Sequence, residues 1–210
     1  GLDEKGRPQF VNEKGEITTS SINFQERDLT DFLKYEGPSD PVYSGSLSNI
    51  FNYKGFHLNI FMTYAFGNVV RLNPVFSGSY TDLTSMTQVF KNRWMVSGNE
   101  KTTNVPGILA YRDVRENYEL TYGYNAYNYS TERIAKGDFI RMKEVSLAYD
   151  FPQAWFHGTP IGNMSVKLQA TNLFLIYADK KLNGQDPEFI NAGGVASPMP
   201  RQFTLTVKLG

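Results

Sequence analysis

The sequence predicts an all-β chain of long antiparallel strands, and three observations lead to this prediction. Apolar and polar residues alternate with a period of two along about five stretches, which is typical of strands with one apolar face. Each stretch is about 9 to 14 residues long, whereas an ordinary strand has about 5–6 residues. The connections between the stretches are alternately short and long. Together these features favour a segment of a transmembrane β-barrel.

The first predicted strand, residues 43–53, is the least regular. Only Lys54-Gly55 separates it from the second, residues 57–66, which indicates a tight hairpin turn. The second strand shows the clearest alternation. The remaining predicted strands cover about 138–151, 164–171 and 202–209.

The lengths of the connections predict where they lie. Residues 67–137 and 176–200 form long links, whereas Lys54-Gly55 and 152–163 are short. In an antiparallel meander, alternate connections emerge at the same end of the sheet. We therefore expect 68–136 and 176–200 at one end and the short turns, Lys54-Gly55 and 152–162, at the other. Outer-membrane barrels have this arrangement, with long extracellular loops and short periplasmic turns.

A soluble β-sandwich, such as a glycan-binding module, is the alternative, because its strands also have one apolar face. Sandwich strands are shorter, however, and insertions of about seventy residues are uncommon in compact domains. Aromatic residues also gather near the strand ends, as in the two interfacial girdles of a membrane barrel. The pattern therefore favours the barrel, and the detergent dependence of the purified protein separates the two hypotheses.

The composition excludes several classes of function. The 210 residues carry 21 Lys+Arg and 21 Asp+Glu, so the chain lacks the basic excess of a nucleic-acid binder. Cysteine is absent, which excludes disulfides, thiolate metal sites and Cys nucleophiles. The longest apolar run, residues 173–178, is far below the roughly 20 residues of a transmembrane helix. The first residues do not resemble a signal peptide, so either the chain is not exported or Gly1 is not its natural start.

Catalysis, cofactors and metals are not predicted. The two histidines, His57 and His157, are far apart in sequence, and no phosphate-binding loop or dinucleotide motif is present. Asp186 and Glu188 resemble a glycosidase carboxylate pair in their types, but Asp-Pro-Glu in a Gly-rich loop is more typical of a turn. We therefore expect a protein that is not an enzyme.

The period of two assigns side chains to the two faces of the sheet. We expect one polar set to face a watery lumen or a plug inside it: His57, Asn59, Thr63, Ser165, Lys167, Gln169, Thr171, Thr204 and Thr206. We expect one apolar set to face lipid: Leu58, Ile60, Met62, Val166, Leu168, Leu205 and Val207. A dry core between two sheets around the polar set would contradict the barrel.

Arg141 and Lys143 conflict with this assignment, because their parity places both on the lipid face. Two interpretations stay open. The two side chains lie at headgroup level against lipopolysaccharide phosphates, where charge costs little. Alternatively, a β-bulge near Lys143 turns the basic side chains inward and Ile140 and Met142 outward.

Short motifs run in order along the whole chain. They are Gly1-Leu2-Asp3 with Gly6-Arg7-Pro8, Tyr35-Glu36-Gly37-Pro38, Asn52-Tyr53-Lys54-Gly55-Phe56, Arg93-Trp94, Phe139-Ile140-Arg141-Met142, Thr171-Asn172-Leu173-Phe174 and Asp186-Pro187-Glu188. In this order they resemble the C-terminal region of SusC/RagA-type TonB-dependent outer-membrane transporters. Ser97 and Asn99 depart from the Pro and Asp that are usual in that family.

The resemblance implies a 22-stranded barrel in the cell outer membrane, with residues 1–210 as the C-terminal part of the barrel domain. The plug domain, the segment that contacts TonB, and the earlier strands would lie outside this chain. The family imports oligosaccharides or peptides beneath a SusD-like lipoprotein lid. The implied partners are that lid, TonB, the rest of the barrel, and outer-membrane lipid with lipopolysaccharide. A passive porin-like barrel is the alternative that lacks energy coupling.

Aromatic residues of the longest loop are the candidate contacts for substrate or lid. An aromatic ring with a polar tip packs on the apolar faces of sugars or peptides and also forms hydrogen bonds. Alternatively, these side chains pack the loop itself. The candidates are Trp94, Tyr118, Tyr122, Tyr124, Tyr127 and Tyr129.

The C-terminal strand carries one further expectation. Phe203, Leu205, Val207 and Leu209 share the lipid-facing parity, so the next residue on that face would be position 211. We expect the natural chain to continue with a terminal Phe, and the closing strand to pair with the first strand of the barrel. An open strand edge in lipid would leave backbone groups unpaired, at several kcal/mol each.

Overall fold

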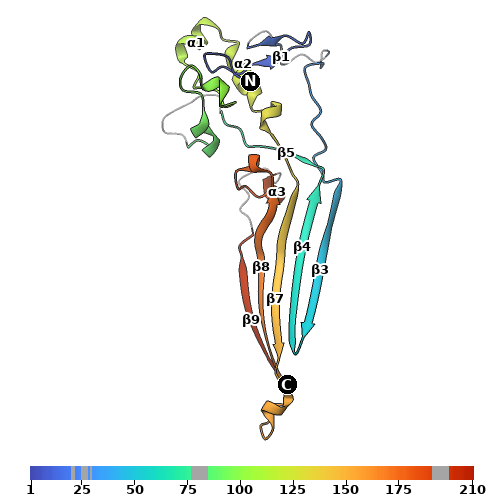
Figure 1. Ribbon diagram of the computed structural model, residues 1–210. Coiled ribbons are helices and arrows are strands. Elements are labelled where there is room, and N and C mark those ends of the chain that lie inside the picture. Colours follow the sequence, from blue (N-terminus) through green and yellow to red (C-terminus); the bar gives the residue numbers. More distant parts are fainter. Residues whose placement is uncertain (20–21, 25–27, 29, 77–84, 191–198) are drawn as a thin grey trace. The chain divides into compact units, whose positions relative to one another are not determined.

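The computed structural model describes residues 1–19, 22–24, 28, 30–76, 85–190 and 199–210. The chain divides into two compact units, and Figure 1 labels most of their helices and strands. The loop unit comprises Gly1–Glu36 and Arg71–Ile134, and the sheet unit comprises Gly37–Val70 and Ala135–Gly210.

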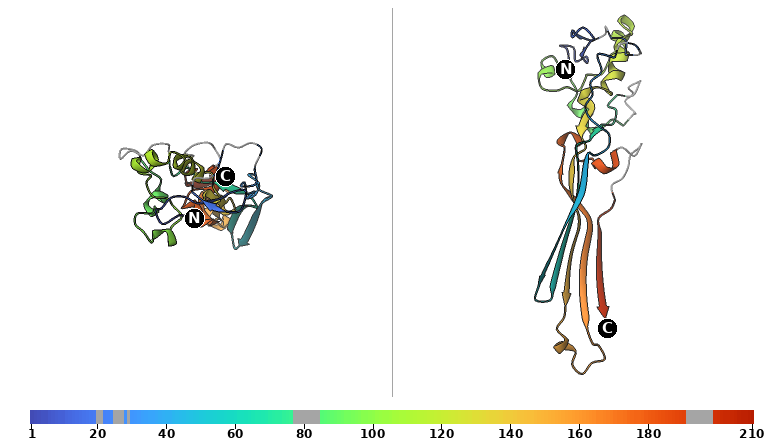
Figure 2. Two further views of the ribbon diagram at one scale, coloured as in Figure 1. Left: turned by 90° about the horizontal axis from the view of Figure 1, so that it is seen from above. Right: turned by 90° about the vertical axis from the view of Figure 1, so that its right-hand side faces the viewer.

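The sheet unit contains a five-stranded antiparallel sheet with the strand order β3-β4-β7-β8-β9. Its strands are β3 (Tyr43–Tyr53), β4 (Phe56–Phe66), β7 (Phe139–Asp150), β8 (Met164–Ala178) and β9 (Gln202–Leu209). Figure 2 shows that they form a single layer. The other sheets among the described residues are two-stranded, β1 with β2 and β5 with β6, too small for the second layer of a sandwich. The predicted all-β fold with about five long strands is confirmed.

The register shows which connections share an end of the sheet. Phe139 pairs with both Ala65 and Ala178, so the long connections after β4 and β8 leave the sheet at the same end. The opposite end carries the Lys54-Gly55 turn and the short link between β7 and β8. Lys54 and Gly55 both have positive φ, 46° and 86°, as a type I′ turn requires.

A β-bulge interrupts β7 at Lys143, which has no partner on either side. Glu144 pairs with Phe61, but Met142 pairs with the next residue of β4, Met62. The bulge moves Arg141 to the face that carries Glu144, and the second of the two interpretations of Arg141 is confirmed. On the other side, β8 skips two residues opposite Lys143, and one of them, Asn172, has a φ of 53°.

The loop unit consists of short elements around a small core. They are β1 (Phe10–Val11), β2 (Ile17–Thr18), α1 (Tyr111–Glu116), α2 (Leu120–Tyr127), and 3-10 helices at Gln88–Asn92, Asn99–Lys101 and Thr131–Arg133. The core holds Val75, Phe90, Val105 and Tyr127, with Phe10, Phe76, Met86 and Val89 packed against it. Strands β5 (Val69–Arg71) and β6 (Ile134–Lys136) pair where the chain passes between the units.

Several elements of the sheet unit depart from the sequence expectation. The sheet unit has 3-10 helices at Gln153–Phe156 and Lys180–Leu182, and α3 spans Pro187–Ile190. Strand β8 continues to Ala178 rather than ending at 171, because the bulge at Asn172 breaks the alternation without ending the strand. Within the described residues, no helix has the length and hydropathy needed to cross a membrane.

Candidate functional site

The two faces of the five-stranded sheet differ in chemistry. Residues paired across neighbouring strands project to the same face. His57 pairs with Ala148, which pairs with Lys167, and Lys167 pairs with Thr206. This register gathers on one face, the polar face, all the residues expected to line a lumen: His57, Asn59, Thr63, Ser165, Lys167, Gln169, Thr171, Thr204 and Thr206. That this face lines a watery lumen stays a prediction.

The opposite face, the apolar face, carries the residues expected to contact lipid. Leu58 pairs with Leu147, which pairs with Leu168, and Leu168 pairs with Leu205. Leu168 is 53% exposed and Leu205 is 66% exposed, so the described residues leave this face uncovered. Aromatic rings cluster at both ends of the sheet. The clusters are Phe56–Tyr149–Phe151–Trp155 at the turn end, with successive ring centroids 4.4, 4.9 and 5.7 Å apart, and Tyr64–Phe66 at the loop end, 5.6 Å apart.

Side chains on the polar face bond to one another at the turn end. The His57 ring nitrogens lie 2.6 Å from Asn52 Oδ1 and 2.9 Å from Asp150 Oδ2. Further along the strand, the amide oxygen of Asn59 accepts a hydrogen bond from the Ser48 hydroxyl at 3.2 Å. These bonds fix polar groups of three neighbouring strands on one surface.

A buried ion cluster lies at the loop end of the polar face. Arg141 Nη2 donates a hydrogen bond to Asp186 Oδ2, and Arg141 Nε lies 2.7 Å from Glu188 Oε2. The Arg141 and Asp186 side chains are only 7% and 6% exposed, whereas that of Glu188 is 31% exposed. Asp186 also accepts the backbone N–H of Glu188 at 3.1 Å, which fixes the turn into α3. The cluster therefore docks the start of α3 against β7.

Sequence reasoning singled out the members of this cluster separately but did not join them. It considered Asp186 and Glu188 as a carboxylate pair or a turn, and it left two orientations open for Arg141. The structure shows that both carboxylates are engaged by one guanidinium. The sequence did contain a signal, because strict alternation placed the charged Arg141 on the apolar face. A charged side chain at such a position needs a bulge that turns it to the polar face and a partner of opposite charge there.

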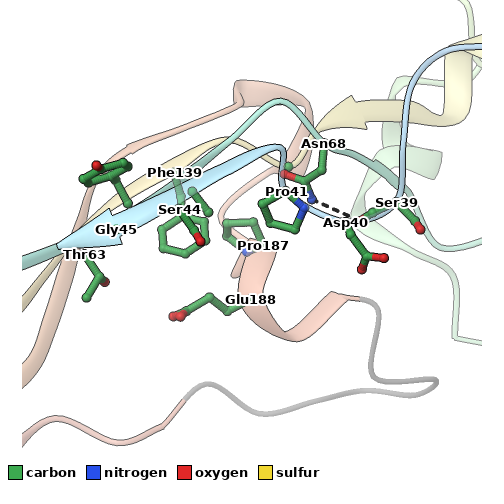
Figure 3. Close-up of a pocket in the computed structure, with 13 residues that line it drawn as sticks. Ser39, Asp40, Pro41, Ser44, Gly45, Thr63, Asn68, Phe139, Pro187 and Glu188 are labelled. Atoms are coloured by element: carbon green, nitrogen blue, oxygen red, sulfur yellow. Dashed lines mark hydrogen bonds between the residues drawn. The ribbon is translucent and has the colours of Figure 1, made fainter.

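A pocket of about 510 Å³ lies beside this cluster, wholly within the sheet unit. Figure 3 shows Pro187 and Glu188 of α3 facing residues of β3, β4 and β7, among them Ser44, Thr63 and Phe139. Asn68 also lines the pocket, and its side-chain N–H donates to Ser39 O at 3.4 Å. The buried atoms Thr63 Oγ1 and Asn68 Oδ1 have no hydrogen-bond partner among the described residues.

The structure divides the candidate tyrosines of the long loop. Tyr124 and Tyr127 are 7% and 4% exposed, and Phe76 packs edge-on against both rings. Burial raises the pKa of both hydroxyls. These two side chains therefore pack the loop unit itself.

Three other tyrosines remain available at the surface. Tyr118, Tyr122 and Tyr129 are 65%, 47% and 64% exposed. Tyr118 and Tyr122 contact each other edge to face, with centroids 5.8 Å apart, and Arg71 lies over the Tyr129 ring at 5.5 Å. Whether they touch substrate or a lid stays a prediction.

Trp94 is half-buried inside the loop unit. Its indole N–H donates to Glu100 Oε2 at 3.0 Å, and its ring packs on Gly6 and Gly107. The backbone N–H of Glu100 and the Trp94 indole hold the pKa of the Glu100 carboxyl below its usual value. No group of three or more His, Asp or Glu residues in the described part of the chain could hold a metal ion.

Comparison with known proteins tests the predicted resemblance. No protein-family model matches the chain. TonB-dependent receptor P39 of Formosa agariphila is 24% identical over 161 residues, which cover 74% of this chain and 14% of the receptor. Solved structures of a RagAB peptide importer cover the whole chain. The open-open state has a TM-score of 0.66 at 22% identity, and the closed-closed state has 0.63 at 24%.

The chain has the fold of a TonB-dependent transporter segment. The predicted resemblance to SusC/RagA-type transporters is thereby confirmed. The chain spans about a seventh of the receptor and about a fifth of the importer chain, 14% and 21% respectively. RagAB is a peptide importer, whereas the name of the Formosa receptor specifies no substrate.

Proposed function

We propose that residues 1–210 are the C-terminal part of the barrel domain of a TonB-dependent importer in the outer membrane. The observation that carries this proposal is a single-layer sheet with an exposed apolar face opposite a polar face. A sheet exposed to lipid on one face and water on the other has this alternation. The similarity to TonB-dependent receptors and to the fold of a RagAB importer supports the same function.

The dimensions of the sheet fit a bilayer. Strand β4 has 11 residues, which span about 36 Å at about 3.3 Å per residue. Barrel strands tilt by about 35–45°, so β4 would cover an apolar band of roughly 25 Å. The aromatic clusters at the two ends of the sheet match the girdles that sit at the two interfaces.

The sheet also has two edges that a membrane would not tolerate unpaired. Strands β3 and β9 are the outer strands, and no described residue pairs with the outer edge of either. Unpaired backbone groups in lipid cost several kcal/mol each. The remaining strands of the same barrel would pair with both edges, and lipid and lipopolysaccharide would cover the apolar face.

The cargo of this importer would be oligosaccharides or peptides, and the RagAB likeness favours peptides. A SusD-like lipoprotein would close the mouth, and TonB would act through a segment outside this chain. Exposed loop tyrosines, Tyr118, Tyr122 and Tyr129, are the side chains available for substrate or lid. In this role the chain binds and conducts, without catalysis or a cofactor.

Energy coupling is the property that tests this function. The full-length protein, expressed in a strain that lacks it, should import labelled peptides or oligosaccharides, and an uncoupler of the inner-membrane proton gradient should stop uptake. Uptake that continues after uncoupling would identify a passive pore instead. A full-length protein that purifies as a monodisperse species without detergent would contradict the membrane location.

A further inference from the structure

The loop unit contains the same turn twice in succession. The first turn, residues 2–8, has the sequence Leu-Asp-Glu-Lys-Gly-Arg-Pro, and the second turn, residues 11–17, has the sequence Val-Asn-Glu-Lys-Gly-Glu-Ile. In both, an Asp or Asn precedes Glu-Lys-Gly, a charged residue follows, and apolar residues flank these five positions. The two segments therefore match in residue type position by position.

Hydrogen bonds show that the two turns also share one geometry. The side-chain Oδ1 of Asp3 in the first turn, and of Asn12 in the second, accepts the backbone N–H groups two and four residues further on. The distances are 2.9 and 2.8 Å in the first turn and 3.0 and 2.8 Å in the second. Gly6 and Gly15 have φ values of 73° and 80°. In both turns the flanking apolar residues are antiparallel partners, so the second turn is a structural copy of the first.

Trp94 covers the first turn. A Cβ added to Gly6 would lie 2.3 Å from the Trp94 ring, so the indole rests directly on the glycine backbone. Gly107 also contacts this ring, and its backbone N–H donates to Gly6 O at 2.9 Å. The flanking residues Leu2 and Pro8 are buried. A turn of this shape therefore accepts an indole at the position that its glycine leaves open.

The second turn has no such cover among the described residues. No atom there lies within 4 Å of a Cβ added to Gly15. The flanking residues Val11 and Ile17 are 58% and 70% exposed, and they lie on one face because they pair across the hairpin. Phe10, which packs against the loop-unit core, belongs to the opposite face. The hairpin therefore exposes two apolar side chains near an uncovered glycine.

The charges of the second turn favour a basic neighbour. Glu13, Lys14 and Glu16 are all exposed, which leaves two carboxylates against one ammonium group. In the first turn, by contrast, the Asp3 carboxylate is paired with Arg7. A partner that presents an aromatic ring beside a basic side chain therefore complements the second turn.

We propose that the second turn docks a tryptophan of a partner protein, with the indole lying on Gly15 as Trp94 lies on Gly6. An indole offers a large apolar surface, and Val11 and Ile17 pack against it. The carboxylates of the turn attract a basic residue next to that tryptophan. This site is independent of the importer function, because it follows from the likeness of the two turns alone.

A labelled peptide of residues 92–107 is the probe for this site, because it carries Trp94 with Arg93 beside it. It is titrated against the purified full-length protein, and binding is followed by fluorescence anisotropy. We expect saturable binding that weakens about tenfold when the peptide carries Trp94→Ala, because a buried aromatic anchor dominates the affinity of such contacts. Equal affinity of the two peptides, or no saturable binding, would overturn the proposal.

Variants of the full-length protein locate the bound peptide. Gly15→Asn keeps a residue type that tolerates positive φ but adds a Cβ beneath the indole, and we expect it to weaken binding about fivefold. Ile17→Ser removes apolar contact without backbone strain and should weaken binding about threefold. Gly98→Asn is the matched control, since Gly98 also has positive φ and open space around an added Cβ, and it should leave the affinity unchanged.

Two results of this series contradict the site. Unchanged affinity in both Gly15→Asn and Ile17→Ser would place the peptide elsewhere, as would an equal loss in Gly98→Asn. A full-length structure in which another segment of the same chain covers Gly15 would also overturn the proposal.

Discussion

In the loop unit the apolar side chains of Val75, Phe90 and Tyr127 are buried against one another, whereas in the sheet unit those of Leu168 and Leu205 are more than half exposed. The loop unit therefore gains stability in the usual way, by removing apolar surface from water. The sheet unit is held together by the hydrogen bonds between its strands and by the surroundings that cover its apolar face. The two units of one chain therefore place their apolar side chains differently: the loop unit buries them in its own core, and the sheet unit presents them on its surface.

The buried ion cluster is the exception within the sheet unit, because charged side chains are buried there against one another. Breaking this cluster should have the largest effect on stability. Arg141→Met leaves the Asp186 and Glu188 carboxylates without their cation. Removing one partner of a buried pair costs about 3–5 kcal/mol. We expect residues 179–190 to lose hydrogen-exchange protection in the full-length protein. Lys143→Met, two residues away on the bulge, should leave protection unchanged, and adding Asp186→Asn with Glu188→Gln should restore most of it.

Phe90→Ala tests whether the loop unit has its own core. Truncating a buried aromatic side chain costs about 3–5 kcal/mol, and Phe90 is 7% exposed within the loop-unit core. We expect faster amide exchange in α2 and around Val75, with β4, β7 and β8 unchanged. Tyr118→Ala is the control, because Tyr118 is 65% exposed. Equal loss of protection in the strands would show that the two units unfold together.

Two neighbours on β8 sharpen the contrast between the faces. Leu168→Arg places a charge on the apolar face, at about 2–4 kcal/mol if that face meets the bilayer midplane. Gln169→Arg places the same charge on the polar face and should be nearly neutral. Denaturant titration of the full-length protein folded into lipid vesicles measures both. If the two variants lose equal stability, the assignment of lipid to the apolar face is wrong.

Two glycines of the loop unit separate packing from backbone strain. Gly6 has a φ of 73°, and an added Cβ would lie 2.3 Å from the Trp94 ring. Gly98 has a φ of 99° but no atom within 4 Å of an added Cβ. We expect Gly6→Ala to cost about 1–3 kcal/mol more than Gly98→Ala, because only Gly6→Ala forces Trp94 to move. Thermal melts that show equal shifts for both variants would mean that the Trp94 contact adds nothing.

The strands were predictable because alternation is a local property of the sequence. Residues 202–209 were located correctly from a period of two, and the end of residues 43–53 was located from the Lys54-Gly55 turn. Helices α1 and α2 were not found, because six and eight residues give too few turns for a helical period to show. Tyr124 and Tyr127 could not be told from Tyr118 in sequence, since burial in the loop unit depends on contacts with distant Phe76.

The polar face was predictable in composition but not in detail. Period-two parity brought His57, Lys167 and Thr206 together, as the register shows. The ion cluster was not found, because Arg141 and Asp186 are 45 residues apart and no local rule joins them. The pocket was not found for the same reason, since its walls come from β3, β4, β7 and α3.

The single extra residue at Lys143 divides β7 into two halves, between which the alternation of side chains on the two faces is shifted by one residue. Between Glu144 and Asp150, even-numbered residues belong to the polar face, whereas before the bulge Arg141 and Phe139 belong to it instead. Deleting Lys143 would therefore remove the bulge and let β7 pair with β4 as one regular strand, with every side chain on the face that it occupies now. If Lys143 instead took a regular place in the ladder, the first half would turn over, so that Arg141 projected from the apolar face and Ile140 and Met142 from the polar face. The bulge at one backbone position thus keeps two stretches of sequence on the correct faces of one sheet.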